Sequence, residues 1–374
     1  MAKYRIVKVE SKRDLKKFIK FPHKLYKDCP QYVPALDSGQ MKSLTTESSL
    51  KHCTTKLWMV FEGKKVVGRI CGIINPVYNN KHNKRRARFA WFDTINDIEV
   101  ARLLLDTAEA WAKEHGMTEI HGPLYYNNLG KQGMLYEGYE NTPPFNCIYN
   151  YPYYNDLLKE LGFVKEYDWV QYKVRADQPI PEKLIRITDR LMERYNLKIA
   201  NVEELAKDKQ LIRDFFRTYS DSFQDVVYNF IPFTDEEIEE QTNQVAGLLK
   251  NDYCCLVMDE NDELAAFGVG FPSLSEAFKK MKGKIFPFGW WHLMRALKKN
   301  DTADLMLTGA APKWQNTGIS AIYHVRMSQT YTKAGVKWAI TNPQIDTNVA
   351  VNVWDRYEDK EVYMRRRCYI KTIE

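Results

Sequence analysis

The sequence predicts an α/β fold of the mixed (α+β) kind, organised as two similar halves that each hold a mixed central sheet flanked by helices. Three observations support this prediction. Strand-like and helix-like segments alternate along the chain. Both halves run in the same order: hairpin, third strand, helix, strand, short helix and final strand. The length of 374 residues suits two domains of roughly 100–200 residues each.

In the first half, alternating and apolar runs predict the strands, and a 3.6-residue apolar period that ends at Gly116 predicts the main helix. The prolines and aromatic residues of the segment from Phe21 to Leu36 predict an extended arm rather than a helix. The expected elements are a hairpin at 57–61 and 66–74, a strand at 88–95, a helix at 99–115, a strand at 118–121, a helix at 157–161 and a strand at 169–174.

Two prolines in 177–181 mark a linker, and an amphipathic stretch at 183–195 predicts a connecting helix. The expected domains are therefore 1–176, a linker with its helix at 177–195, and 196–374. The second half is expected to hold helices at 203–222 and 235–250, a hairpin at 253–258 and 264–270, a strand at 304–308, a helix from Ser320, a strand at 337–341, a helix near 348–357 and a strand at 362–370.

Composition excludes several classes of protein. With 44% hydrophobic and 28% charged residues the chain is neither disordered nor fibrous, and no apolar run reaches the ~20 residues of a membrane span. Its N-terminus lacks the apolar core of a signal peptide. Seven scattered cysteines without a CxxC pair indicate free thiols in a reducing cytoplasm and no metal site. A net charge of +7 is too mild to indicate nucleic acid, and oligomeric state is not indicated.

The sharpest chemical signal lies between a predicted strand and a predicted helix, at residues 312–320. A glycine-containing turn at this place leaves backbone N–H groups of the helix start unpaired, and the helix dipole adds positive potential. Gly318 allows close backbone approach, and Ser320 offers a hydroxyl. These features predict a phosphate or pyrophosphate site; an ordinary strand-to-helix turn is the equally weighted alternative.

This segment resembles the pyrophosphate loop of the Gcn5-related N-acetyltransferases (GNAT), which reads Gln/Arg-x-x-Gly-x-Gly/Ala between a strand and a helix. Gln315 and Gly318 match that pattern, and Ser320 stands where Gly or Ala is usual. The resemblance implies two tandem GNAT-like domains, with coenzyme A or acyl-CoA as co-substrate and direct attack of an amine on the thioester. The cofactor-binding residues it implies are Gln315, Asn316, Thr317, Gly318, Ile319, Ser320, Asn342 and Asn348.

Two positions are candidates for catalysis. Asp304 precedes the loop on its strand, where members of the family often place an acidic base. Tyr357 is the candidate general acid, although it falls two residues after the family's Tyr position, which is Asp355 here.

The first half resembles the same fold but has no glycine and three acids in 93–99, and these acids would repel a pyrophosphate. It is therefore expected to be a degenerate domain. Further segments, among them 22–26, 67–70, 122–124 and 150–154, resemble a bacterial family of tandem GNAT-fold proteins that is similar to the bacterial ceramide synthases. That resemblance implies an N-acyltransferase with a small-molecule or lipid amine acceptor, such as a sphingoid base.

Two further segments could hold substrate. Seven basic residues and no acidic ones surround Trp290 and Trp291 in the segment 278–299, which suits an acyl-chain cover or an anionic membrane surface; a helix with solvated lysines is the alternative. The turn-rich loop 122–144 is expected either to line a site, with His121, Asn127 and Glu137 as substrate-binding candidates, or to be a surface loop packed by its own tyrosines.

Two rival interpretations remain open: a non-catalytic GNAT-fold binding protein, and a peripheral membrane protein without transfer. The expected location is the cytoplasm, with membrane association as an alternative.

Overall fold

The computed structural model describes residues 3–223, 227–245, 249–348, 353–355, 357 and 359–373, and its chain divides into two compact units. Unit 1 comprises residues 1–170, 274–294 and 364–374, and unit 2 comprises 171–273 and 295–363. Neither unit is one continuous segment, because a strand near the end of each half continues into the other unit. The expected domain limits at 176 and 196 remain predictions.

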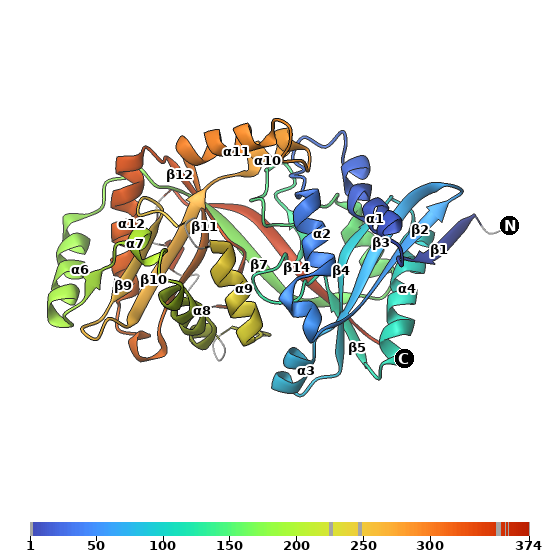
Figure 1. Cartoon of the computed structure of the whole chain (residues 1–374), viewed down its shortest axis with the longest axis horizontal. Coiled ribbons are helices and arrows are strands. Elements are labelled where there is room, and N and C mark those ends of the chain that lie inside the picture. Colours follow the sequence, from blue (N-terminus) through green and yellow to red (C-terminus); the bar gives the residue numbers. More distant parts are fainter. Residues whose placement is uncertain are drawn as a thin grey trace. The chain divides into compact units, whose positions relative to one another are not determined.

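The elements up to the end of the first half follow the predicted order (Figure 1). They are β1 (Tyr4–Lys8), α1 (Lys12–Leu25), α2 (Asp37–Thr45), η1 (Ser48–Lys51), β2 (Thr54–Glu62), β3 (Lys65–Ile74), α3 (Pro76–His82), β4 (Arg86–Thr94), α4 (Ile98–Glu114), β5 (Glu119–Gly122), β6 (Met134–Glu137), α5 (Tyr153–Glu160) and β7 (Val164–Arg175).

The second half has the same order of hairpin, third strand, helix, strand and final strand, and it carries two helices rather than one between the hairpin and the third strand. Its elements are α6 (Glu182–Arg194), β8 (Lys198–Ile199), α7 (Val202–Leu205), α8 (Lys209–Phe223), α9 (Asp235–Val245), β9 (Cys254–Met258), β10 (Leu264–Pro272), α10 (Ser275–Met281), α11 (Gly289–Lys298), β11 (Thr302–Ala310), η2 (Pro312–Trp314), α12 (Ser320–Ala334), β12 (Trp338–Thr341), β13 (Gln344–Ile345) and β14 (Glu361–Thr372). The helix expected at 203–222 is divided into α7 and α8, and the one expected near 348–357 lies largely outside the described residues.

The two units share one sheet topology. In unit 1 the strands β1 to β4 pair antiparallel, β4 pairs parallel with β5, and β5 pairs antiparallel with β14. In unit 2 the strands β8 to β11 pair antiparallel, β11 pairs parallel with β12, and β12 pairs antiparallel with β7. The closing strand of each sheet therefore comes from the other half of the sequence.

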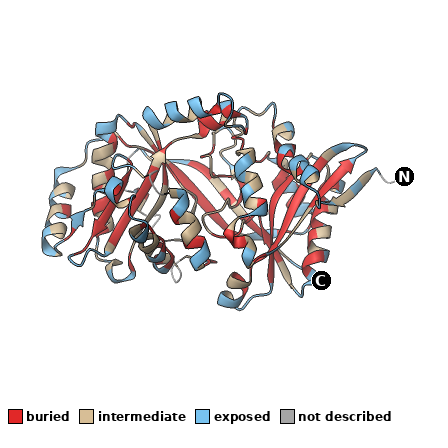
Figure 2. Cartoon of the chain, in the orientation of Figure 1, coloured by how far each residue is buried: buried red, intermediate tan, exposed pale blue. Residues whose placement is uncertain are grey.

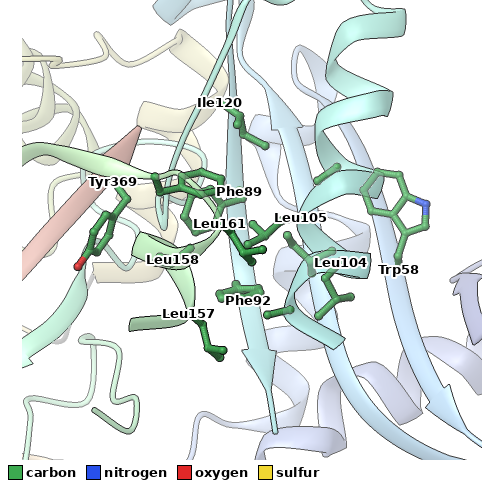
Figure 3. Close-up of a cluster of buried hydrophobic side chains, with 14 of the residues drawn as sticks. Trp58, Phe89, Phe92, Leu104, Leu105, Ile120, Leu157, Leu158, Leu161 and Tyr369 are labelled. Carbon is green, nitrogen blue, oxygen red and sulfur yellow. The ribbon is translucent and has the colours of Figure 1, made fainter. Parts of the chain in front are cut away.

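Alternation along β2 builds two cores on the two faces of the unit 1 sheet. Trp58 and Val60 pack with α4 and α5 on one face, and Met59 and Phe61 pack with α1 and α2 on the other. Figure 2 shows the resulting buried strands between partly exposed helices, and Figure 3 shows the α4 and α5 core around Phe89 and Leu104. Because both faces of this sheet are buried, its strands are nearly continuous apolar segments in the sequence.

The extended arm predicted from Phe21 onwards is wrong at its start, because α1 continues through Pro22 to Leu25. Proline lacks the N–H that would bond the carbonyl of Phe18 in the preceding turn. Arg69 supplies the missing donor, since its Nη1 donates to that carbonyl oxygen at 2.8 Å. A tertiary contact thus permits a helix that the local sequence disfavours.

Replacing Leu104 by alanine should lower the free energy of unfolding by about 3 kcal/mol, because the side chain is fully buried in the α4 core. Urea unfolding followed by fluorescence measures the change. The neighbouring variant Leu103→Ala is the control, since Leu103 is only partly buried, and it should cost less than half as much. Equal costs for the two variants would contradict the assignment of Leu104 to the core.

Candidate functional site

Both units contain a parallel strand pair that separates part of the way along. In unit 2, β11 pairs with β12 only from Thr302 to Leu305, and β11 then continues to Ala310 beside β10 alone. A register shift opposite Val269 and Gly270 marks a bulge where the separation begins. The structure thereby opens space at the carboxyl ends of two parallel strands, where ligands commonly bind in α/β sheets.

The loop that follows β11 leads into the N-terminus of α12, where several backbone N–H groups have no acceptor among the described residues. Gly318 has φ +84° and Asn316 has φ +63°, and the helix begins after Ile319 without a side-chain cap. The first backbone bonds of the helix start are donated by Ala321 and Ile322. Among the described residues, the backbone N–H groups of residues 316–320 have no acceptor. These donors and the helix dipole together form an anion-binding geometry.

Side chains around this loop fix its shape rather than fill it. The Gln315 amide donates from Nε2 to the carbonyl of Ser222 at 3.1 Å, and Thr317 Oγ1 donates to the carbonyl of Trp314 at 2.7 Å. A Cβ atom added at Gly318 would meet only Leu191, at 3.9 Å. The positive φ of Gly318 therefore shapes the turn, while the space beside it stays open.

The corresponding helix start in unit 1 is closed by the protein's own carboxylate. Asp97 Oδ1 accepts from the backbone N–H groups of Glu99 at 2.9 Å and Val100 at 3.4 Å, and Tyr4 donates its hydroxyl to Oδ2 at 2.6 Å. Hydrogen bonds, of which that from Tyr4 contributes most, lower the pKa of Asp97, so this carboxylate stays charged. A second anion would meet a negative charge where unit 2 offers open donors.

A pocket of about 410 Å³, a volume that includes the solvent at its open mouth, lies beside the separating strands of unit 2. Leu305 and Thr308 of β11 line it together with Tyr323 and His324 of α12. Tyr357, the candidate general acid, also lines this pocket, and its ring lies 5.6 Å from that of Trp354.

The other predicted residues of unit 2 occupy different positions. Asn342 lies at the point of separation, where its N–H donates to Leu305 at 2.8 Å and its Nδ2 to Met306 at 3.2 Å, both carbonyl oxygens. Asn348 ends the turn that follows β13, with its N–H donating to the carbonyl of Ile345. Asp304 is 1% exposed and lies in register with Ile340, inside the paired part of the strands. The structure does not bring Asp304 to the pocket that holds Tyr357.

His121 lies in a buried charged network of unit 1. Its Nδ1 is 2.9 Å from Oε2 of Glu166, whose Oε1 accepts from Arg86 Nη1 at 2.7 Å. Burial lowers the pKa of His121, so the neutral ring donates Nδ1–H to the carboxylate. Burial opposes ionisation of Glu166, but hydrogen bonding from His121 and the charge of Arg86 outweigh it and lower its pKa to about 2.

The ligand atoms of His121, Glu166 and Cys368 lie within 4.8 Å of one another. Arg86 bonds to that carboxylate and Arg88 is buried nearby, so two guanidinium groups would oppose a cation. This donor set does not fit a metal ion.

The remaining predicted substrate residues are dispersed. Asn127 is buried and caps its own loop by accepting the N–H of Leu129 at 3.1 Å. Glu137 forms a half-exposed ion pair with Arg365 at 3.1 Å. Trp290 and Trp291 lie on α11 with 49% of their surface exposed.

Unit 1 holds a polar pocket of about 550 Å³, a volume that includes the solvent at its open mouth, and the site residues predicted from the sequence do not include its charged residues. It lies where β4 and β5 separate, and the loop expected to line a site contributes Tyr125 and Lys131. Arg69 Nε donates to Asp93 Oδ2 at 2.7 Å, while Lys131 Nζ donates to the carbonyl of Cys147 at 3.0 Å. Burial lowers the pKa of Lys131 to about 8. The sequence feature that could have indicated this pocket is the presence of two charged residues, Arg69 and Asp93, within otherwise apolar strands.

These features define a class: the protein has the tandem GNAT fold. It is similar over 99% of both chains to a tandem GNAT protein from the clavulanic acid biosynthesis pathway, with a TM-score of 0.58 and 10% identity. No protein-family model matches the chain.

Two curated relatives align over nearly the whole chain. Protein YghO of Escherichia coli (strain K12) is 28% identical over 97% of this chain and 94% of its own length. The bacterial ceramide synthase of Caulobacter vibrioides (strain NA1000 / CB15N) is 26% identical over 96% of each chain.

The Glu166 network predicts a pH dependence of stability. Because the folded-state pKa of Glu166 lies near 2 and its ordinary value is 4.5, its stabilisation is present above pH 4.5 and lost as the pH falls towards 2. Glu166→Gln should therefore cost about 3 kcal/mol at neutral pH and flatten acid unfolding in that window.

Denaturant unfolding across pH measures both effects. Glu137→Gln, which removes the exposed ion pair with Arg365, is the matched control and should change stability by less than about 1 kcal/mol. An unchanged acid dependence in Glu166→Gln would show that the network does not control it.

Proposed function

We propose that the protein is an acyl-CoA-dependent N-acyltransferase whose second unit binds the thioester and whose acceptor is an amine of a long-chain lipid, such as a sphingoid base. The observation that carries this proposal is the contrast between the two helix starts. Asp97 occupies the donors in unit 1, whereas those of residues 316–320 have no acceptor among the described residues. Of these two helix starts, the second is the one at which a pyrophosphate would meet no capping carboxylate.

The residues around the separating strands suit the rest of such a ligand. Open N–H groups of residues 316–320 would hold the pyrophosphate, and Asn342 lies at the point where a pantetheine arm would pass between the strands. Bound acyl-CoA would supply the activated acyl group as a thioester. The Tyr357 hydroxyl, in the pocket beside β11 and α12, would hold a proton for the departing thiolate.

The choice of a lipid amine rests on the similarity to the ceramide synthase of Caulobacter vibrioides. Calorimetric titration with coenzyme A, acetyl-CoA and palmitoyl-CoA tests the acyl donor, and a long-chain preference would justify titrating sphingoid bases as acceptors. Affinity that rises with chain length supports a lipid N-acyltransferase, and equal affinity for all three indicates a short-chain transferase. Absence of binding would favour the rival interpretation, a non-catalytic protein of the same fold.

Gly318→Asp should weaken coenzyme A binding roughly 100-fold or more, because it brings a carboxylate against the pyrophosphate. Gly335→Asp is the matched control, since Gly335 ends the same helix with φ +76° and has no neighbour within 4 Å of an added Cβ. Both variants strain a left-handed residue, so only loss of binding specific to Gly318 supports the proposed site. Equal affinities in the two variants would refute it.

Tyr357→Phe should lower kcat roughly 100-fold and leave the affinity for coenzyme A unchanged, because it removes only the proton donor. Steady-state kinetics and calorimetry separate these effects. Tyr228→Phe, which alters an exposed tyrosine of the same unit, should retain full activity. Full activity of Tyr357→Phe would exclude it as the general acid.

A further inference from the structure

The segment that contains α10 and α11 exposes an unusual concentration of large apolar side chains. Eleven such residues are exposed in the described parts of the chain, and six of them lie between residues 286 and 297. Phe286 and Phe288, in the connection between the two helices, are 75% and 76% exposed. The other four lie on α11: Trp290, Trp291, Met294 and Leu297.

The opposite side of this segment is packed firmly within unit 1. Phe278 and Met281 of α10 are buried with Val33, and the partly buried Ile285 and Leu293 extend this cluster. Ser275 Oγ donates to the carbonyl of Pro143 at 2.8 Å. The segment therefore buries one set of its apolar side chains within unit 1, and the exposed side chains are a separate set.

The exposed side chains form a second apolar stripe on α11. Trp290, Met294 and Leu297 follow the i, i+4, i+7 spacing of one helix face. A stripe of this kind is normally buried, and an exposed one marks an interaction surface. Figure 2 shows the predominantly exposed surface of α11.

Positive charge surrounds the stripe. Lys280, Lys282 and Lys284 are exposed before it, Lys298 and Lys299 are exposed after it, and no acidic residue occurs from 277 to 300. The first three form no ion pair with any residue that the structure describes. A two-fold contact between copies of this stripe would bring like charges together, whereas an anionic surface would complement them.

We propose that residues 280–298 dock the protein on an anionic lipid bilayer. Phe286 and Phe288 enter the acyl boundary, Trp290 and Trp291 lie at the headgroup level, and the lysines contact lipid phosphates. No helix in the described parts of the chain is long and apolar enough to cross a membrane, so the contact lies along the surface. Docking is independent of the proposed acyl transfer and needs no acyl-CoA.

Co-sedimentation with vesicles tests the proposal. Without acyl-CoA, the protein should bind phosphatidylcholine vesicles that contain phosphatidylglycerol, and bind pure phosphatidylcholine vesicles far more weakly. Phe286→Ser with Phe288→Ser should reduce binding to the anionic vesicles at least ~10-fold. Val164→Ser is the control, because Val164 is 61% exposed elsewhere in unit 1, and it should bind as the wild type.

Two double lysine variants test how much the positive charge contributes to vesicle binding. Lys280→Gln with Lys284→Gln should weaken binding roughly 20-fold, and Lys64→Gln with Lys65→Gln, at the exposed β2–β3 turn, should not. Equal binding to both kinds of vesicle, or equal effects of the two lysine pairs, would overturn the proposal. The proposal would also be overturned if sedimentation equilibrium showed a dimer of the wild type and a monomer of the Phe286→Ser, Phe288→Ser variant. That result would assign the stripe to self-association.

Discussion

The architecture of each unit depends on one constraint, a parallel strand pair inside a largely antiparallel sheet. Parallel strands require a crossover, and α4 and α12 provide it on one face of each sheet. The pair also stops early, because β11 leaves β12 after Leu305. The helix start, the bulge and the pocket all follow from that separation.

The two units show how the same geometry acquires different chemistry. Asp97 closes the first helix start with a carboxylate, whereas Ile319 leaves the second without a side-chain cap. The residue at the cap position therefore decides whether a carboxylate of the chain itself accepts hydrogen bonds from the positive end of the helix. Unit 1 also has a polar pocket beside its separating strands, lined by Arg69 and Lys131 among others. A pocket is therefore present there even though the helix start of unit 1 is capped by Asp97.

The two halves exchange their closing strands, and the order of elements along the sequence does not indicate that exchange. The strand expected to complete the first half runs on as β7 to pair with β12, and β14 completes the first sheet beside β5. Each strand combines apolar and charged residues, and neither pattern identifies a pairing partner. Contacts between buried polar groups are equally hidden in the sequence: nothing near His121 along the chain indicates that Glu166, 45 residues away, lies beside it.

The sequence by itself determined what depends on neighbours along the chain. Hairpins, the amphipathic helices α4 and α6, and the glycine turn at Gly318 follow from local periodicity and backbone preference. The tertiary structure decided what depends on distant partners. Arg69 supplies the hydrogen bond that allows α1 to continue through Pro22. Residues of α10 pack against Val33, while the apolar stripe of α11 stays exposed. Local periodicity reports that a face is apolar; only packing determines what that face contacts.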